Sequence, residues 1–493
     1  MTLIRTEPFE TEQWNRFELR IEGPQEGNPY KEIALSAQFQ FGHRSIQVDG
    51  FYDGDGQYVI RFMPDCIGSW SFTTSSSTAQ LDGLTGTLIC TAPTSADNHG
   101  PVKVDQMYHF SYADGTPFYP VGTTAYVWNH QGEQLEQQTL RSLSQAPFNK
   151  IRMCVFPKHY DYNASEPEHF AFAGSLQEGF DWETFNPDFW RRLESQLEQL
   201  QALGIEADLI LFHPYDRWGF SRMSAESDDY YLRYAIARLA SFRNIWWSLA
   251  NEYDLMFEKK MTDWDRFFRI LQEHDPYQHL RSIHNWHNPE IHYRSNLHWY
   301  DHGKPWVTHA SIQHADLNFV TEWRELYRKP IVIDECRYEG NLNHGWGNIT
   351  AERMVECFWE GMAQGGYVTH GETYVHADDI IWWSHGGELH GRSAERIAFL
   401  RRMMEEGPRL DTSRINFKWD AFAGCVEGEY YLIYLGTSRP AFRSLTLPEG
   451  AAFRIDLIDT WEMSISPLEG EFTGECSVPL PGIPYQALRI RKI

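Results

Sequence analysis

Long hydrophobic runs are missing from this 493-residue chain: no stretch approaches the roughly 20 apolar residues that a membrane span needs. The first residues, MTLIRTEPFE, also lack the apolar core of a signal peptide, so we expect a cytoplasmic protein. Cysteine is scarce, with seven scattered residues and no CxxC pair. This scatter predicts buried free thiols in a reducing compartment and argues against a disulfide framework or a zinc site.

Positive charge is also in short supply. The chain has 43 Lys and Arg residues against 68 Asp and Glu, which gives a net charge of −25. Nucleic acids and anionic membranes are bound through basic surfaces, so we expect neither as a partner. The 21 histidines show no metal-binding spacing such as HExxH, and we therefore expect no metal ion and no other cofactor.

Aromatic residues, by contrast, are abundant: they make up 15% of the chain and include 19 tryptophans. Most must belong to the core, but the tryptophans in predicted loops are harder to assign to packing. Flat apolar rings with a donor edge suit the faces of sugar rings, so a carbohydrate is a candidate ligand. The loop tryptophans are Trp218, Trp286, Trp299, Trp346, Trp382 and Trp383.

The pattern of elements divides the chain into three predicted domains. Residues 1–98 read as short strands separated by turns such as DGDG, which is typical of a β-sandwich. Residues 99–408 alternate eight strand-like runs with amphipathic helical segments, as a (β/α)₈ barrel requires; a doubly wound sheet is the alternative. Residues 409–493 return to β and predict a second sandwich. We expect both sandwiches to be structural flanks.

Acidic residues end two of the eight predicted barrel strands. The fourth, NIWWSLANE, ends in Asn251 and Glu252, and the seventh, PIVIDEC, carries Glu335. Strand alternation predicts that Glu252 shares the inner face with Ser248, and Glu335 with Ile333. Strands four and seven face each other across a barrel whose active site lies at the strand ends. Two opposed carboxyls there form the pair that glycoside hydrolysis uses.

Other predicted strand ends carry polar side chains that belong to the same candidate site. Each has a structural alternative, because a single histidine at a strand end is more often a hydrogen-bonded support. Glu372 on the predicted eighth strand is a rival partner for Glu252; we prefer Glu335 because it lies opposite and expect Glu372 to contact substrate. The polar residues are Arg152 in strand two, His213 in three, His284 in five, Gln313 and His314 in six, and His370, Glu372 and Tyr374 in eight.

LANE followed by IVIDE resembles the retaining glycoside hydrolases of the (β/α)₈ superfamily called clan A. The segments RFELRIEGPQEGNPY and FYDGDGQYVIRFMPDCIGSWSF extend the resemblance to an uncharacterised group assigned as glycoside hydrolases. That group has an N-terminal sandwich, a barrel and a C-terminal sandwich. The resemblance implies that Glu252 is the acid/base and Glu335 the nucleophile.

The same resemblance implies roles for three neighbours. Asn251 would bind the sugar 2-hydroxyl, Arg152 would keep Glu335 ionised, and His213 would face the cleaved sugar. We expect His284 to bind substrate as well. The family resemblance covers essentially the whole chain, and its motifs are specific only in their context at the strand ends.

Two departures from the family concern the sugar subsite. Many members carry His-x-Tyr at the end of strand six, where this chain reads SIQHAD. Gln313, His314 or Tyr374 would replace that tyrosine. The tryptophan that often follows strand eight is displaced to Trp382 and Trp383. These differences affect the expected specificity more than the expected mechanism.

The sequence therefore predicts a retaining glycoside hydrolase that cleaves a glycosidic bond in oligosaccharides or glycosides by double displacement. The alternative is a catalytically inactive carbohydrate-binding or scaffold protein on a glycosidase fold. The two opposed glutamates favour the enzyme, because a binding site has no need of them.

Overall fold

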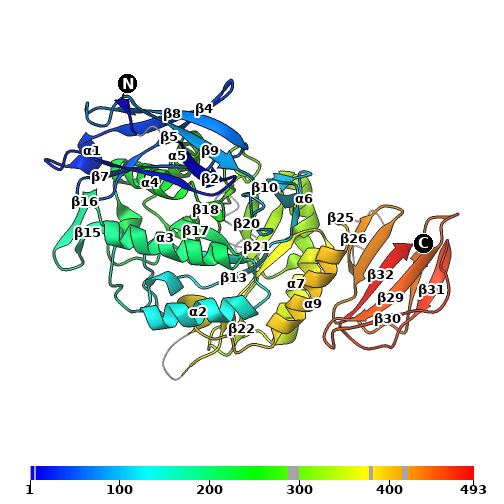
Figure 1. Ribbon diagram of the computed structural model, residues 1–493. Helices are drawn as coiled ribbons and strands as arrows, with labels where there is room; N and C mark the ends of the chain where they lie inside the picture. The colour runs from blue at the N-terminus through cyan, green and yellow to red at the C-terminus, as the bar shows by residue number, and fades with distance from the viewer. Residues whose placement is uncertain (1, 5–6, 287–298, 377–380, 413–419) are drawn as a thin grey trace.

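The computed structural model describes residues 2–4, 7–286, 299–376, 381–412 and 420–493. Three β-rich parts follow one another along the chain, as Figure 1 shows: a sandwich at the N-terminus, a central barrel and a second sandwich at the C-terminus. This arrangement confirms the barrel flanked by two sandwiches that the sequence predicts. Within the described residues no helix is long and apolar enough to cross a membrane.

Two sheets form the N-terminal sandwich, and their strands alternate buried and exposed side chains so that one face of each meets the other. Phe39 and Phe62 stack between the sheets with ring centroids 3.9 Å apart. The larger sheet contains β1 (Thr2–Leu3), β2 (Phe9–Glu12), β4 (Leu35–Phe41), β5 (Arg44–Asp49), β8 (Gly68–Ser76) and β9 (Leu84–Thr91). The smaller contains β3 (Phe17–Glu22), β6 (Phe51–Tyr52) and β7 (Gln57–Phe62).

Eight parallel strands form the central barrel, in the order in which they occur along the chain. A bridge between His284 and Ser311 joins the fifth and sixth strands, so the ring closes and a doubly wound sheet is excluded. The strands are β13 (Val121–Thr124), β14 (Lys150–Cys154), β17 (Glu206–Phe212), β18 (Ile245–Ala250), β19 (Arg281–Ser282), β20 (Ala310–Gln313), β21 (Ile331–Glu335) and β23 (Tyr367–His370). The last ends at His370, so the prediction that Glu372 and Tyr374 lie on this strand is wrong.

Helices cover the outside of the barrel and begin at recognisable caps. The side chain of Asn186 accepts the backbone N–H of Asp188 at the start of α3, where Pro187 occupies the first turn without losing a hydrogen bond. Ser224 and Thr350 cap α4 and α7 in the same way. The covering helices are α2 (Glu133–Gln145), α3 (Pro187–Ala202), α4 (Ala225–Leu239), α5 (Met261–His274), α6 (Val320–Tyr327), α7 (Ala351–Ala363) and α9 (Ser393–Glu406).

Charged side chains occupy the barrel interior. Lys150 Nζ lies 2.9 Å from Asp208 and 2.7 Å from Asp334, and all three side chains are buried. Asp334 therefore points inward, and strand alternation turns Ile333 toward the helices. The prediction that Ile333 and Glu335 share the inner face is wrong. A register shift between β20 and β21, which pairs Gln313 with Glu335, accompanies the turn of this last residue toward the barrel mouth.

Buried ion pairs hold the N-terminal sandwich against the barrel. Arg61 on β7 contacts Glu194 on α3 at 2.7 Å, and Arg238 on α4 contacts Asp53 at 2.7 Å. Arg238 also contacts Glu194 at 2.6 Å, so the four charges form one network. The sandwich thus rests on the helical outside of the barrel, away from the strand ends.

The C-terminal sandwich lies against α7, on the right of Figure 1. Trp359 of α7 packs on Tyr434 of the sandwich, with ring centroids 5.5 Å apart. One sheet contains β25 (Asp411–Thr412), β26 (Phe422–Val426), β27 (Tyr430–Tyr434), β29 (Phe453–Asp459), β30 (Ser464–Pro467) and β32 (Gln486–Lys492). The other contains β28 (Phe442–Thr446) and β31 (Glu475–Pro479).

Short elements complete the fold. One small sheet packs Phe110 against Trp246 of the barrel, with ring centroids 5.2 Å apart. All seven cysteines lie in described segments, and all are free thiols, as the sequence predicts. The short elements are β10 (Val102–Asp105), β11 (His109–Tyr112), β12 (Pro117–Phe118), β15 (Phe172–Ser175), β16 (Gly179–Phe185), β22 (Glu339–Gly340), β24 (Glu372–Thr373), α1 (Pro29–Glu32) and α8 (Trp382–His385).

Candidate active site

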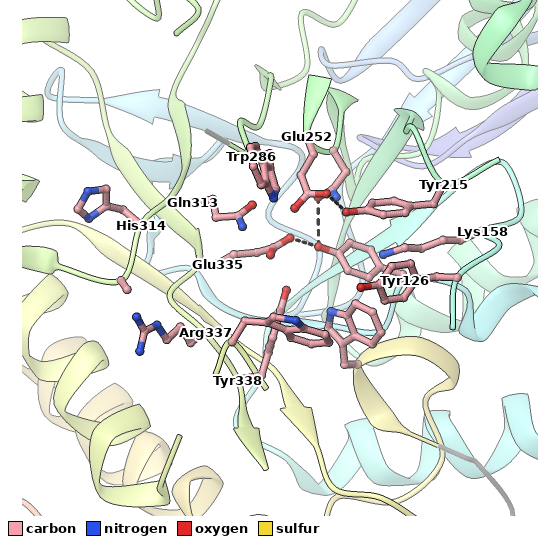
Figure 2. A pocket seen from close by; sticks show the side chains of 15 residues that line it. Tyr126, Lys158, Tyr215, Glu252, Trp286, Gln313, His314, Glu335, Arg337 and Tyr338 are labelled. Atoms are coloured by element: carbon pink, nitrogen blue, oxygen red, sulfur yellow. Dashed lines mark hydrogen bonds between the residues drawn. The ribbon is translucent and has the colours of Figure 1, made fainter. Parts of the chain in front are cut away.

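A cavity of about 270 Å³ opens at the carboxyl ends of the barrel strands, where barrel enzymes place their chemistry. Figure 2 shows its lining, in which carboxyl groups face a wall of aromatic rings. The lining residues are Tyr126, Lys158, Tyr160, Tyr215, Asn251, Glu252, Trp286, Gln313, His314, Ala315, Glu335, Arg337, Tyr338, Trp346 and Trp383. Such a mixture of flat apolar surfaces and a few polar groups suits a sugar.

Glu252 follows the fourth barrel strand and does not continue it. Its backbone is left-handed, with φ at 50°, which is uncommon for a residue with a side chain and typical of functional sites. The Tyr215 hydroxyl donates to the carboxyl group. With its amide nitrogen turned toward the pocket, Gln313 donates to the other oxygen at 3.0 Å. Burial, and then the negative charge of Glu335, raise the pKa of Glu252 to about 8.

Glu335 ends the seventh strand and receives a hydrogen bond from the Tyr126 hydroxyl. His284 Nε2 lies 4.0 Å from its carboxylate. Burial raises the pKa of Glu335, while the Arg152 charge and the Tyr126 hydrogen bond act in the opposite direction. The Arg152 charge opposes the effect of burial on the pKa of Glu335, whereas the negative charge of Glu335 adds to the effect of burial on the pKa of Glu252. Glu252 is therefore the carboxyl group that the surroundings favour in its protonated form.

Arg152 lies below the pocket and connects its floor to the barrel interior. It contacts Asp334 at 3.0 Å and donates to Asn251 Oδ1 at 3.0 Å. Because the Asn251 oxygen is held from below, its amide nitrogen is left for a ligand. Arg152 therefore pairs directly with Asp334 and acts on Glu335 through its charge.

Two predicted histidines lie outside the cavity lining. His213 Nε2 lies 3.2 Å from the Phe156 carbonyl oxygen, in the hydrogen-bonded structural arrangement that was the alternative for such residues. His284 is fully buried behind Glu335. Burial lowers the pKa of both, so both are neutral at pH 7. In the sixth strand, His314 and Gln313 do line the cavity, in the place expected for the family's tyrosine.

Three predicted residues near the eighth strand point elsewhere. Glu372 belongs to a separate ribbon, β22–β24, and accepts the backbone N–H of Gly391 at 2.9 Å. Tyr374 donates to Glu339 at 2.9 Å, and Trp382 donates to Thr123 at 2.9 Å. Trp383, together with Trp286 and Trp346, lines the cavity in place of Trp382.

Glu339, His370 and Glu372 form a buried group whose ligand atoms lie within 4.8 Å of one another, close enough to consider a metal ion. The Glu339 carboxylate, however, already accepts the backbone N–H groups of Arg392 at 2.8 Å and Ser393 at 3.2 Å. These donors lie at the start of α9, so the Glu339 carboxylate satisfies N–H groups of its first turn. The expectation that the protein needs no metal stays a prediction.

The sequence reading missed the tyrosines and the lysine of the cavity. Tyr126 follows the first strand by two residues, Tyr215 follows the third by three, and Lys158 lies in the loop after the second. Tyr338 follows the seventh strand by three residues. The available signal was position: each lies within four residues of the end of a barrel strand, whereas most of the predicted residues were expected on the strands or at their ends.

The chain is similar to known protein families over nearly all its length. Residues 105–411 match the family model described as "Apiosidase-like, catalytic domain". Residues 10–77 and 419–491 match two domains of unknown function, DUF5060 and DUF5605. No curated protein matches the chain.

Solved structures agree with these matches. A "putative glycoside hydrolase" from Bacteroides vulgatus ATCC 8482 is 39% identical with a TM-score of 0.92, over 98% of this chain and 100% of that chain. A family 5 glycoside hydrolase from the same organism, 15% identical over 80% of this chain and 94% of that chain, shares the fold with a TM-score of 0.60. The resemblance proposed from LANE and IVIDE is thus confirmed. The chain belongs to the apiosidase-like catalytic-domain family and has the fold of a glycoside hydrolase.

Proposed function

We propose that this protein is a retaining glycoside hydrolase that cleaves oligosaccharides or glycosides by double displacement, with Glu335 as nucleophile and Glu252 as acid/base. One observation carries the proposal: two buried carboxyl groups line the same cavity, and the Arg152 charge favours the ionised form of Glu335 while the Glu335 charge favours the protonated form of Glu252. A carbohydrate-binding protein without activity gains nothing from burying such a pair, because each buried carboxyl group costs desolvation.

In the first step Glu335 attacks the anomeric carbon and forms a covalent glycosyl ester. The positive charge of Arg152 and the Tyr126 hydroxyl favour the carboxylate form that this attack needs. Glu252 protonates the departing oxygen, and its pKa of about 8 keeps the proton available at neutral pH.

In the second step Glu252, now a carboxylate, removes a proton from water as the water attacks the glycosyl ester. The bond between sugar and Glu335 breaks, and the anomeric configuration of the substrate is retained after the two inversions. Asn251 would donate to the sugar 2-hydroxyl through the amide nitrogen that its Arg152 contact leaves open. Neither step requires a metal ion or a cofactor.

The cavity supports action on short substrates. Its volume of about 270 Å³ lies at the small end of ligand sites, which favours a terminal sugar over the interior of a long polymer. Trp286, Trp346 and Trp383 offer ring faces for stacking. The name of the matching family makes apiosides the first substrates to test.

A panel of aryl glycosides tests the proposal, because only an enzyme releases the aryl group. Glu335→Ala should lose at least about a thousandfold in kcat/KM. Glu252→Ala should keep residual activity on activated aryl glycosides, and azide should increase that activity, because a small anion replaces the water that Glu252 would activate. Product NMR should show the retained anomer first. Full activity in either variant, or an inverted product, would reject the assignment.

A further inference from the structure

A lysine that the mechanism above does not use lies beside both carboxyl groups. Lys158 follows β14 in the loop FPKHY, and its side chain is only 3% exposed. In the part of the chain that the structure describes, no carboxylate lies within ion-pair distance of its ammonium group. A buried lysine without an ion pair is costly, so its retention in the cavity calls for an explanation.

Aromatic rings surround the Lys158 ammonium group. Its nitrogen lies 4.0 Å from the ring centre of Tyr126, 4.3 Å from that of Tyr215 and 4.5 Å from that of Trp383. Cation–π contacts of this kind are worth more when both partners are removed from water. Figure 2 shows the lysine reaching in from the loop with its nitrogen against the rings. The rings thus stabilise the buried ammonium group in place of an ion pair.

Two of these rings carry the hydroxyl groups that hold the carboxyls. Tyr126 donates to Glu335, and Tyr215 donates to Glu252. One ammonium group therefore packs on both tyrosines, and each tyrosine serves a different carboxyl group. The His159 backbone N–H donates to the Tyr215 carbonyl at 2.8 Å, which fixes the lysine loop to the tyrosine loop.

We propose that Lys158 is a positioning residue for the glycosidase reaction: it orients Tyr126 and Tyr215 through their ring faces and places one positive charge beside both Glu335 and Glu252. The proposal rests on the glycosidase function and adds a residue that the reaction needs without a contact to the reacting atoms.

The charge balance around Lys158 gives the direction of its effect. Its positive charge lowers the pKa of both Glu335 and Glu252, in opposition to burial. Burial lowers the pKa of Lys158 itself. Removing this charge should raise the pKa of both carboxyls and move the whole bell-shaped pH profile to higher pH. The titratable and charged groups that face Lys158 are Tyr126, Arg152, Cys154, Tyr160, His213, Tyr215, Glu252 and Glu335.

The test is the pH dependence of kcat/KM in Lys158→Met and Lys158→Arg with an aryl glycoside that the wild type hydrolyses. In Lys158→Met the acid limb, the low-pH side of the plot of kcat/KM against pH, should move to higher pH by about one unit, because an opposite charge nearby shifts a carboxyl pKa by one unit or more. In Lys158→Arg the acid limb should lie at the wild-type pH, because the positive charge is kept. Arg337→Met is the matched control: it removes another cation from the lining without touching either tyrosine, and its acid limb should stay in place.

An acid limb that is unchanged in Lys158→Met, with only kcat reduced, would overturn the proposal and leave Lys158 as a packing residue. Lys158→Gln repeats the measurement should the methionine variant not fold. Thermal unfolding at pH 7 gives a readout without turnover. Lys158→Met should be less favourable for Tm in the wild type than in Glu335→Gln, because only the wild type has the Glu335 carboxylate that the lysine charge stabilises. Equal changes in Tm in the two backgrounds would also overturn the proposal. A wild type that hydrolyses no glycoside would instead contradict the glycosidase function, and the thermal comparison would still test Lys158.

Discussion

Replacing Glu252 by glutamine should make the protein more stable at alkaline pH. The ordinary pKa of a glutamate is 4.5, and that of Glu252 is about 8 because the carboxyl group is buried and lies near Glu335. Between these values the unfolded chain ionises while the folded protein keeps the proton. The unfolded state therefore binds fewer protons, and the free energy of unfolding falls as pH rises through this window.

The size of the effect follows from the two pKa values. Each pH unit in the middle of the window costs about 1.4 kcal/mol, and the slope is smaller near the two pKa values, so the loss from pH 4.5 to pH 8 is on the order of 4 kcal/mol. Glutamine cannot ionise and escapes this loss. The difference in free energy of unfolding between Glu252→Gln and wild type should thus grow with pH up to about 8 and then level off.

Urea unfolding at half-unit pH steps from 5 to 9 measures this difference. Glu206→Gln is the matched control, because burial also raises the pKa of Glu206 to about 8 at the opposite end of the barrel. Both variants should gain stability at high pH, and only Glu252→Gln should lose turnover. A difference between Glu252→Gln and wild type that stays flat with pH would show that Glu252 is ionised at neutral pH, and would remove the physical basis for its role as the acid.

Three further substitutions test other parts of the site. Glu372→Gln should keep turnover within about threefold of wild type, because Glu372 lies outside the cavity and accepts the backbone N–H of Gly391 in the loop before α9; complete loss of turnover would instead support Glu372 as the nucleophile. Trp383→Ala should raise KM about tenfold with a smaller change in kcat, as expected for a lost stacking surface, measured by initial rates. Asp334→Asn should cost about 3–5 kcal/mol in urea unfolding, because Lys150 and Arg152 lose their buried partner.

The fold was accessible from sequence because barrel strands buried on both faces appear as short apolar runs, and eight of them recur at regular spacing. The strand ends then gave Glu252 and Glu335. The directions in which the Glu252 and Glu335 side chains point could not be predicted from the sequence. The left-handed backbone of Glu252 and the register shift beside Glu335 both break strand alternation, and neither has a signature in WWSLANE or IVIDE.

The residues that the sequence reading misplaced share a physical cause. The sequence places Glu372 and Tyr374 on the eighth strand because GYVTHGETY reads as one strand-like run, yet the strand ends before them and a separate ribbon begins. Lys150 sits inside the barrel because two buried aspartates offset its charge, a pairing across strands that no local pattern reveals. Tyr126 reaches the site from a loop, where periodicity carries no information.

Trapping the glycosyl intermediate tests the proposed mechanism most directly. An activated 2-deoxy-2-fluoro glycoside of the sugar that the enzyme hydrolyses should form a stable ester. The fluorine slows both steps, while the good leaving group speeds only the first, so the ester forms faster than water removes it. Peptide mass spectrometry should then find the sugar on Glu335 in the wild type and find no label in Glu335→Gln. A label on Glu372 or another residue, or turnover with no label at all, would contradict Glu335 as the nucleophile.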